Sequence, residues 1–299
     1  MTRLPLTRPF EFRHTLAFLN AFPPAAHEQS TRGELRKATR LNGQTVGFTV
    51  REDTEGLTCT LHPEAPLKPE EEAALLERVA FFLGTRDDLW PFYALAERDE
   101  VFRPVLNELR GFHQPKFLTP FEAACWAVIG QRLPLPQARK VKLALMVRSG
   151  GEWKGLPAFP EPADLAHLTE AEILELLPNQ RKARALVEAT RAFGGVTTAE
   201  LVNRPHEEVR GWLRGIYGVG EWSALFILVR GLGRLENVRP KAGESPFLKE
   251  LLKAARPVYG GLTPDELWRI AESYGDQQGQ WAIYLRSRSA LTPGGARAA

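Results

Sequence analysis

Apolar and polar residues alternate between positions 35 and 63, where the chain reads LRKATRLNGQTVGFTVREDTEGLTCTLHP. An alternation with a period of two is typical of strands that bury one face. The pairs Asn42-Gly43 and Glu55-Gly56 interrupt it, and pairs of this kind favour tight turns between antiparallel strands. The pattern therefore predicts a small antiparallel meander near the N-terminus.

Most other apolar positions follow the 3.6-residue period of helices. A short helix is expected over residues 12–19, and Pro69 begins an acidic helix that should end at Gly84. The expected core-facing residues of this acidic helix are Ala73, Leu76, Val79 and Ala80. Four later helices are expected to begin at residues that cap helix N-termini, namely Thr119, Thr169, Asn179 and Thr263. Each of the three threonines is followed by a glutamate at the spacing of a capping box.

The composition, with 43% hydrophobic and 25% charged residues among 299, is that of an ordinary soluble protein of two or three domains. The chain has no run of 18 apolar residues and its first residues lack the pattern of a secretion signal, so a cytoplasmic location is expected. Two distant cysteines, Cys59 and Cys125, exclude a cysteine-ligated zinc site or a four-cysteine iron–sulfur cluster. Cys125 is expected in the core.

The net charge of +3 only weakly favours a polyanionic partner. Positive charge is concentrated in residues 131–148, which contain no acid. The basic residues of this run are Arg132, Arg139, Lys140, Lys142 and Arg148. Taken alone, such a run is most simply the solvent-exposed face of a helix.

Two helical segments meet at LRGIYGVGEWSAL, residues 213–225. Apolar residues at helical spacing are Val209, Trp212, Leu213 and Ile216 before the turn, and Trp222, Leu225, Phe226 and Val229 after it. Gly218 and Gly220 permit positive φ angles and close approach to the backbone, and the second helix starts with unpaired N–H groups. Such a turn suits a phosphate group. Val219 is expected to pack beneath it, and the alternative is an ordinary tight turn between helices.

The hairpin pattern L-x-x-I-x-G-V-G-x-W-S-A resembles the helix-hairpin-helix of a DNA glycosylase superfamily, in which a loop rich in glycine and proline and then an aspartate follow. Two further blocks resemble the same superfamily, TPFEAACWAVIGQ at residues 119–131 and LPNQRKARALVEAT at residues 177–190. The three blocks occur in the family's order and rough spacing. Within the superfamily, the sequence most resembles bacterial DNA-3-methyladenine glycosylase II, whose layout would cover nearly the whole chain.

This resemblance implies an α+β fold that is mostly α. The implied units are an N-terminal antiparallel α/β domain (1–88), a helical domain built from 89–118 and 232–290, and a helical domain with the hairpin (119–231). Residues 291–299 are expected to form a disordered tail. The implied protein is a monomer at the nucleoid that binds double-stranded DNA with a damaged base and requires no cofactor, iron–sulfur cluster or membrane.

The resemblance also assigns roles in DNA binding, because a damaged base must leave the helical stack before it is excised. Gly218, Val219 and Gly220 would grip a DNA phosphate, and the carbonyl groups of the two glycines would hold a monovalent cation. The wedge that fills the gap would be Arg132 or Leu133. The remaining implied DNA contacts are Gln131, Arg181 and Lys182.

Trp222 and Phe226 match positions where the family presents aromatic rings to the flipped base. A cationic alkylpurine stacked there would gain about 1–2 kcal/mol of cation–π energy, whereas packing in the hairpin core is the alternative for both rings. The family's pocket tryptophan falls near Ser287, so one pocket wall differs. Lyase-type relatives carry a nucleophilic lysine at the position of Trp222, so the resemblance implies simple hydrolysis.

The catalytic carboxylate departs from the family pattern, because residues 230–252 contain no aspartate. Alignment on Pro240 puts Ala242 at the catalytic position, and alignment on the following helix puts Ser245 there. Glu244 lies beside Ser245 and is the only acid in the loop itself. We therefore expect Glu244 to be the catalytic residue. Alternatively, Glu244 is an ordinary loop residue near the N-terminus of the next helix, where the helix dipole stabilises its negative charge.

We expect a monofunctional DNA glycosylase that excises alkylated purines of the 3-methyladenine type in base-excision repair. It would flip the base from double-stranded DNA and hydrolyse the N-glycosidic bond. One alternative is a lesion-binding or structure-binding protein that keeps the hairpin but has lost the catalytic acid. Another is a helix-hairpin-helix module of an unrelated DNA-processing enzyme, against which the second and third sequence blocks count.

Overall fold

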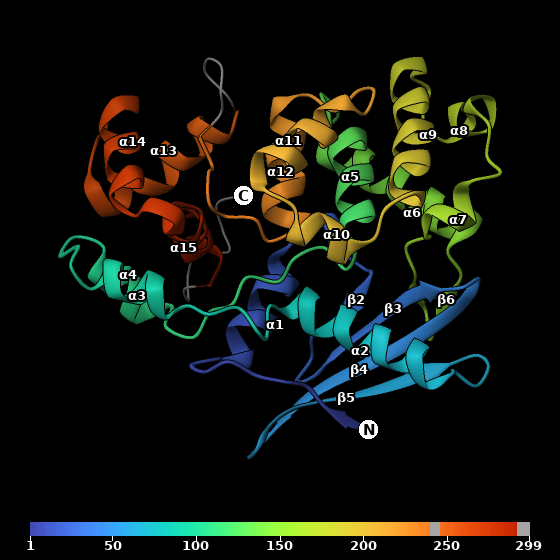
Figure 1. Ribbon diagram of the computed structural model, residues 1–299, viewed down its shortest axis with the longest axis horizontal. Coiled ribbons are helices and arrows are strands. Elements are labelled where there is room, and N and C mark those ends of the chain that lie inside the picture. Colours follow the sequence, from blue (N-terminus) through green and yellow to red (C-terminus); the bar gives the residue numbers. More distant parts are fainter. Residues whose placement is uncertain (240–245, 292–299) are drawn as a thin grey trace.

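The computed structural model describes residues 1–239 and 246–291. A small antiparallel sheet and the helices that cover it form one layer of the molecule, and two groups of helices lie beside each other above this layer (Figure 1). One group contains the hairpin, and the other contains the last helices of the described chain. The expected α+β fold with mostly helical content is confirmed.

Five strands form the N-terminal sheet in the order β1-β5-β4-β3-β2, and all neighbours are antiparallel. The strands are β1 (Thr2–Arg3), β2 (Gln29–Ser30), β3 (Leu35–Leu41), β4 (Gln44–Asp53) and β5 (Gly56–Pro63). The three long strands form the predicted meander, and Asn42 and Gly43 make its first turn with φ angles of 49° and 81°. The sequence pattern does not predict the edge strands β1 and β2, because two residues are too few for an alternation.

Two helices, α1 (Phe12–Ala21) and α2 (Pro69–Leu83), cover the sheet (Figure 1). α2 ends at Gly84 as predicted, with a φ angle of 66°. Its predicted core face is wrong at one position, because Ala73 is exposed and Leu75 is buried in its place. Leu75 packs with Val46 of the sheet, so the buried face of α2 is rotated relative to the predicted one.

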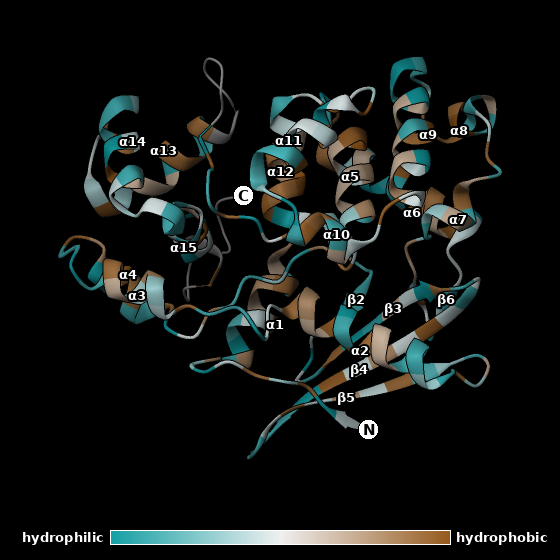
Figure 2. Cartoon of the chain, in the orientation of Figure 1, coloured by the Kyte–Doolittle hydropathy of each residue, from teal (hydrophilic) through white to brown (hydrophobic). Residues whose placement is uncertain are grey.

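The hairpin group contains α5 to α12 and a short ribbon. Its helices are α5 (Pro120–Ile129), α6 (Leu135–Ser149), α7 (Pro162–Leu165), α8 (Glu170–Leu176), α9 (Gln180–Gly194), α10 (Thr198–Asn203), α11 (His206–Gly215) and α12 (Glu221–Gly231), and its ribbon strands are β6 (Glu152–Trp153) and β7 (Leu156–Pro157). Every residue of α5 is buried, and Figure 2 shows apolar stretches along both α5 and α12. α5 is therefore the central helix of this group rather than an amphipathic surface helix.

All four predicted N-caps accept a hydrogen bond from a backbone N–H of the helix they begin. At Thr119 only half of the predicted capping box forms, because the Glu122 carboxylate accepts from Lys142 Nζ at 2.7 Å. Lys142 also contradicts the solvent-exposed interpretation of the basic run, since it is buried between Glu122 and Glu28. A charge inside a packed group of helices needs such partners.

The C-terminal group contains α13 (Pro246–Tyr259), α14 (Pro264–Ser273) and α15 (Gln278–Leu291), packed with α3 (Trp90–Ala96) and α4 (Arg103–Glu108). Segments before and after the hairpin group therefore lie side by side (Figure 1). One hydrophobic cluster joins these helices to the sheet, and a second fills the hairpin group. The domain boundaries stated above stay a prediction.

Two predicted features fall outside the described residues. Glu244 belongs to the interval 240–245, and all of the predicted tail except Leu291 follows the second described range. Within the two described ranges, no helix has the length and apolar character needed to cross a membrane.

Candidate functional site

The hairpin consists of α11, residues 216–220 and α12. Gly218 has a φ angle of 81°, and a Cβ atom there would lie 2.5 Å from the Cβ of Ala185, so this position requires glycine. Gly220 has a φ angle of −83°, so only the first glycine of the turn uses the left-handed region. Val219 is 5% exposed and packs beneath the turn, as predicted.

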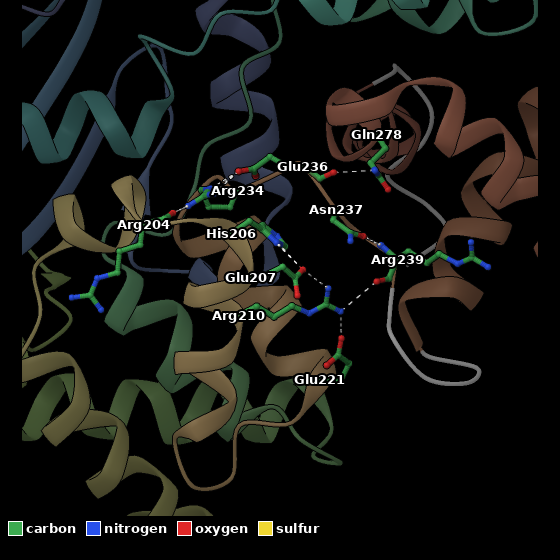
Figure 3. A network of polar contacts seen from close by, with 10 residues as sticks. All are labelled: Arg204, His206, Glu207, Arg210, Glu221, Arg234, Glu236, Asn237, Arg239 and Gln278. Carbon is green, nitrogen blue, oxygen red and sulfur yellow. Dashed lines mark hydrogen bonds and ion pairs between the residues drawn. The ribbon is translucent and has the colours of Figure 1, made fainter.

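The N-terminus of α12 is open on the side of the turn. Gly220 caps it without a side chain, and a Cβ atom on Gly220 would meet no atom within 4 Å. The first N–H groups of a helix lack partners within that helix and attract anions. Glu221 at this end would oppose an anion, but its carboxylate pairs with Arg210 (Figure 3). It also pairs with Arg214 at 3.3 Å. The negative charge of Glu221 is therefore offset by the positive charges of Arg210 and Arg214.

The loop after α5 contacts the hairpin through Gln131. Its Nε2 donates to the carbonyl oxygen of Gly218 at 2.8 Å and to the hydroxyl of Ser223 at 3.1 Å. The next two residues differ in environment. Arg132 is exposed and has a φ angle of 48°, which is uncommon for a residue with a side chain. Leu133 is half-buried against the hydrophobic cluster of the hairpin group.

A cleft of about 1340 Å³ joins the turn, the loop after α5 and the start of α9. All predicted DNA contacts except the buried Val219 line this cleft. Arg181 is exposed there, whereas Lys182 is 9% exposed and its Nζ donates to the carbonyl oxygen of Ile129 at 2.8 Å. Burial lowers the pKa of Lys182. Lys182 therefore braces the end of α5, and Arg181 carries the accessible charge.

A second cavity, of about 520 Å³, lies between α12, α13, α15 and the end of α1. Trp222 and Phe226 line it with stacked rings, whose centroids are 5.4 Å apart and whose planes are inclined by 24°. Phe22 contributes a further aromatic ring from the end of α1. Ser287 of α15 also lines the cavity, where the resemblance places the family's tryptophan. We refer to this cavity as the aromatic pocket.

The aromatic pocket also contains charged side chains that the sequence patterns do not predict as site residues. They are Arg230, Glu250 and Arg286. Arg230 has a local signal, because it follows Trp222 and Phe226 at intervals of four residues and so lies on the same helix face. Glu250 and Arg286 come from α13 and α15, and no local pattern connects those helices with the hairpin.

Arg230 is only 7% exposed. The Cζ atom of its guanidinium lies 4.9 and 4.5 Å from the ring centroids of Phe18 and Phe22. Its Nε and Nη2 atoms have no hydrogen-bond acceptor among the described residues. Burial, and to a smaller extent the charge of Arg286, lower the pKa of Arg230 to about 9. The side chain is therefore still cationic at neutral pH.

The acids near the loop 240–245 differ in what they contact. Glu236 accepts a hydrogen bond from Arg234 Nε at 2.6 Å, and its backbone carbonyl accepts from Gln278 (Figure 3). Among the acids that the structure describes, Glu250 is the one that lines the aromatic pocket. Glu244, the residue expected to be catalytic, lies outside the described ranges.

A polar network connects the hairpin with the segment 234–239, which leads toward the loop 240–245 (Figure 3). The buried Arg210 pairs with Glu221 and donates to the backbone carbonyl of Arg239 at 3.4 Å. The guanidinium of Arg239 in turn pairs with Glu272 of α14 at 2.7 Å. The network therefore links both hairpin helices to the C-terminal group.

In the part of the chain that the structure describes, no cluster of three or more His, Cys, Asp or Glu side chains is placed to hold a metal ion. Cys59 and Cys125 are free and buried. Burial raises the pKa of Cys59 to about 12 and also raises that of Cys125. Both thiols are therefore core residues, as expected for Cys125.

Known proteins share both sequence and fold with this chain. No protein-family model matches it. The DNA-3-methyladenine glycosylase of Bacillus subtilis (strain 168) is 24% identical over 231 residues, which cover 75% of this chain and 75% of that protein. The 3-methyladenine DNA glycosylase of Archaeoglobus fulgidus superposes with a TM-score of 0.74 at 22% identity, covering 96% of this chain and 97% of that one.

An 8-oxoguanine glycosylase/lyase of Clostridium acetobutylicum in its apo form has a TM-score of 0.62 at 17% identity, with 92% of each chain covered. The likeness therefore extends over the sheet and both helical groups. This chain is therefore similar in sequence to a DNA-3-methyladenine glycosylase and shares its fold with solved DNA glycosylases, and its three ordered sequence blocks meet at one cleft.

Proposed function

We propose that this protein is a monofunctional DNA glycosylase, a hydrolase that removes alkylated purines of the 3-methyladenine type from double-stranded DNA in base-excision repair. One observation carries the proposal: Trp222 lines both the cleft at the hairpin and the aromatic pocket. Enzymes that act on a base rotate it out of the duplex into a pocket. A duplex bound at the hairpin would thus have a pocket directly beside it.

In this proposal the turn binds a DNA phosphate through the backbone at Gly218 and Gly220 and through the first turn of α12. Arg132 fills the gap that the flipped base leaves, because its side chain is exposed and a guanidinium stacks on bases. Leu133 packs against the protein and supports the loop. Arg181 adds a contact to the phosphate backbone.

A monovalent cation at the carbonyl groups of Gly218 and Gly220 is part of the proposal. The Gly218 carbonyl already accepts a hydrogen bond from Gln131, and a carbonyl oxygen has a second lone pair for a cation. Such a cation would supply positive charge beside a DNA phosphate. We further propose that the protein acts as a monomer at the nucleoid and requires no other cofactor.

The proposed reaction is hydrolysis of the N-glycosidic bond. Trp222 occupies the position of the lyase lysine, so the hairpin offers no amine nucleophile there. Water adds to the sugar carbon as the base departs with the bonding electrons, through an oxocarbenium-like transition state. A positively charged alkylpurine is a good leaving group. The protein then needs to supply a carboxylate that stabilises the developing positive charge on the sugar.

We assign this carboxylate to Glu244, because the sequence aligns it beside the family's aspartate. Glu250 is a second candidate, because it lines the aromatic pocket together with Trp222. Replacement of either acid by glutamine removes the charge and keeps the shape, so Glu244→Gln and Glu250→Gln form a matched pair.

The test incubates the protein with methylated duplex DNA and measures free 3-methyladenine and 7-methylguanine. We expect release by the wild type and a decrease of roughly a hundredfold in Glu244→Gln, the size seen when a charge-stabilising group is removed from an active site. A decrease in Glu250→Gln alone would move the role to Glu250. Base release that is unchanged in both single variants would exclude both acids from the catalytic role.

The alternative of a lesion-binding protein is favoured by one observation, the absence of aspartate from residues 230–252. It predicts that the wild type binds a duplex with a damaged base and releases no base. That result, obtained with protein of normal thermal stability, would overturn the proposed hydrolase.

A further inference from the structure

Arg184 and Tyr217 form a stacked pair beside the turn, and the function proposed so far gives this pair no role. The Cζ atom of Arg184 lies 4.2 Å from the centroid of the Tyr217 ring. Tyr217 directly precedes Gly218, is 38% exposed and lines the cleft at the hairpin. The stack therefore holds an arginine against a residue of the surface that DNA would approach.

α9 packs directly against the turn and so fixes the position of Arg184. A Cβ atom on Gly218 would lie 2.5 Å from the Cβ of Ala185, the neighbour of Arg184. Arg181 lines the cleft and precedes Arg184 by three residues, so the two are neighbours on one face of α9. Arg184 therefore adds a second accessible positive charge to the part of α9 beside the turn.

The positive charge of Arg184 is not neutralised within the described ranges. Its side chain is exposed and forms no ion pair or hydrogen bond with any residue of 1–239 or 246–291. Glu188, one turn further along α9, pairs with Arg191 at 2.9 Å. The carboxylate of Glu221 at the start of α12 pairs with two arginines of α11. The N–H donors of Arg184 are thus available to a ligand.

A guanidinium that is stacked on a ring suits a phosphate group. Stacking covers a face of the planar guanidinium and leaves the N–H donors at its edge. Two of these donors can bind two oxygens of one phosphate. A long side chain loses rotamer freedom when it binds a ligand, and a side chain that is already held loses less. The ring of Tyr217 thus prepares Arg184 for an anion.

We propose that Arg184, held by Tyr217, binds a second DNA phosphate beside the one at the turn. α9 and the hairpin then form one surface for the DNA backbone. Such a contact positions the duplex and reads no sequence. This inference rests on the proposed function, because it adds a phosphate contact to the same DNA interface.

The test measures affinity for an undamaged duplex by fluorescence anisotropy at several salt concentrations. Arg184→Ala should reduce the magnitude of the slope of log affinity against log salt by about 0.9, the contribution of one phosphate contact. Arg191→Ala is the matched control, because it removes another exposed arginine of α9 that is paired with Glu188 and does not line the cleft. Its slope should match the wild type. An unchanged slope in Arg184→Ala, or an equal decrease in the control, would overturn the inference.

Variants of Tyr217 test whether the ring acts through Arg184. Tyr217→Leu should weaken binding roughly two- to tenfold, because a guanidinium without the ring must be ordered when it binds. Tyr217→Phe keeps the ring face and should retain the wild-type affinity. In an Arg184→Ala background, Tyr217→Leu should cause no further loss. An equal loss in both backgrounds would overturn the stacked pair as the binding unit.

The melting temperature separates phosphate binding from a structural link between α9 and the turn. Arg184→Ala should change it by no more than about 4 °C, as expected of a substitution at an exposed position. A larger decrease together with an unchanged salt slope would identify Arg184 as a structural residue and overturn the inference.

Base release and duplex binding separate this inference from the proposed function. A wild type that releases no base, but whose salt slope decreases in Arg184→Ala, would contradict the hydrolase alone. A wild type that releases base and keeps its salt slope in Arg184→Ala would contradict the second phosphate contact alone. A wild type that binds no duplex at low salt would overturn both.

Discussion

Gly218 and Gly220 belong to one turn, but a side chain meets different surroundings at the two positions. At Gly218 a methyl group would combine a positive φ angle with a contact of 2.5 Å to Ala185. At Gly220 it would point into open space with an ordinary φ angle. The first glycine is therefore required by the fold, whereas the second leaves room for a ligand to approach the backbone.

We expect Gly218→Ala to reduce the free energy of unfolding by about 1–3 kcal/mol, because it adds strain in a position that cannot relax. Gly220→Ala should cost about 1 kcal/mol or less, the difference between two N-cap residues. Gly220→Ala should nevertheless weaken binding to undamaged duplexes of any sequence, measured by anisotropy. Unchanged affinity in this variant would contradict the phosphate-binding role of the turn.

Individual residues of the site can be predicted from the sequence where they belong to a local motif. The turn, Gln131, Trp222 and Phe226 belong to contiguous blocks, and the structure brings them to one cleft and its adjoining pocket. Lys142 was misinterpreted, because a run of basic residues gives no sign that one of them faces buried acids from distant segments. Arg230 has the spacing that places it on the same helix face as Trp222 and Phe226. The sequence alone does not distinguish a charged residue that lines a pocket from one on the surface.

At the scale of elements, Lys142 connects three parts of the fold. Its Nζ lies 2.7 Å from a carboxylate oxygen of Glu122 on α5 and 2.7 Å from one of Glu28. It also donates to the carbonyl oxygen of Pro24 at 3.1 Å, in the short turn after α1. Phe22 of the aromatic pocket precedes this turn, so Lys142 helps to fix one pocket wall.

We expect Lys142→Met to reduce the free energy of unfolding by about 3–5 kcal/mol, because it leaves the buried carboxylates of Glu122 and Glu28 without their closer cation, with Lys37 at 3.4 Å from Glu28 remaining. Lys140→Met removes an exposed charge from the same helix and should change it by no more than about 0.5 kcal/mol. Chemical denaturation of the two variants beside the wild type measures both values. An equal change in the free energy of unfolding in the two variants would show that the buried ion pairs of Lys142 do not stabilise the fold.

The pH dependence of stability provides an independent control on this cluster. Burial alone would raise the pKa of Glu122, but the charges of Lys142 and Lys37 lower it below its ordinary 4.5. A lowered pKa in the folded state means that the stabilisation is present above pH 4.5 and is lost as the pH falls further. In Lys142→Met burial favours protonation of the Glu122 carboxyl group, so the destabilisation relative to the wild type should decrease toward acid pH.

At the scale of the whole molecule, position matters more than net charge for DNA binding. The chain carries a charge of only +3, but Arg132, Lys140 and Arg181 all line the cleft at the hairpin. Positive charge that neutralises DNA phosphates releases counterions, so affinity falls as salt increases. The arrangement of these residues therefore predicts salt-dependent binding in spite of the small net charge.

We expect Arg181→Ala to reduce the slope of log affinity against log salt by about 0.9, the contribution of one phosphate contact. Lys182→Met should leave this slope unchanged, because the ammonium group of Lys182 is engaged with the backbone of Ile129. Anisotropy titrations of an undamaged duplex at several salt concentrations compare the two neighbours. A change of slope for Lys182 and none for Arg181 would reverse the assignment.

The sequence predicted the fold class, the three-stranded meander and the helix starts, because these depend on local periods and caps. The packing of α3 and α4 against α15 depends on contacts between segments that the hairpin group separates in sequence, and no local pattern contains such contacts. For the same reason the sequence could not show that α1, α12, α13 and α15 enclose one cavity. Glu250 and Arg286 come into the site only through that assembly.

The aromatic pocket takes its walls from the beginning, the middle and the end of the described chain. During synthesis on a ribosome, the hairpin and the cleft beside it can form once α12 has emerged. The pocket is still incomplete at that stage, because α13 and α15 are translated later and add walls to those that Phe22, Trp222 and Phe226 supply. A nascent chain therefore completes the cleft at the hairpin before it completes the aromatic pocket, so the proposed excision of a base would require translation to have passed Ser287.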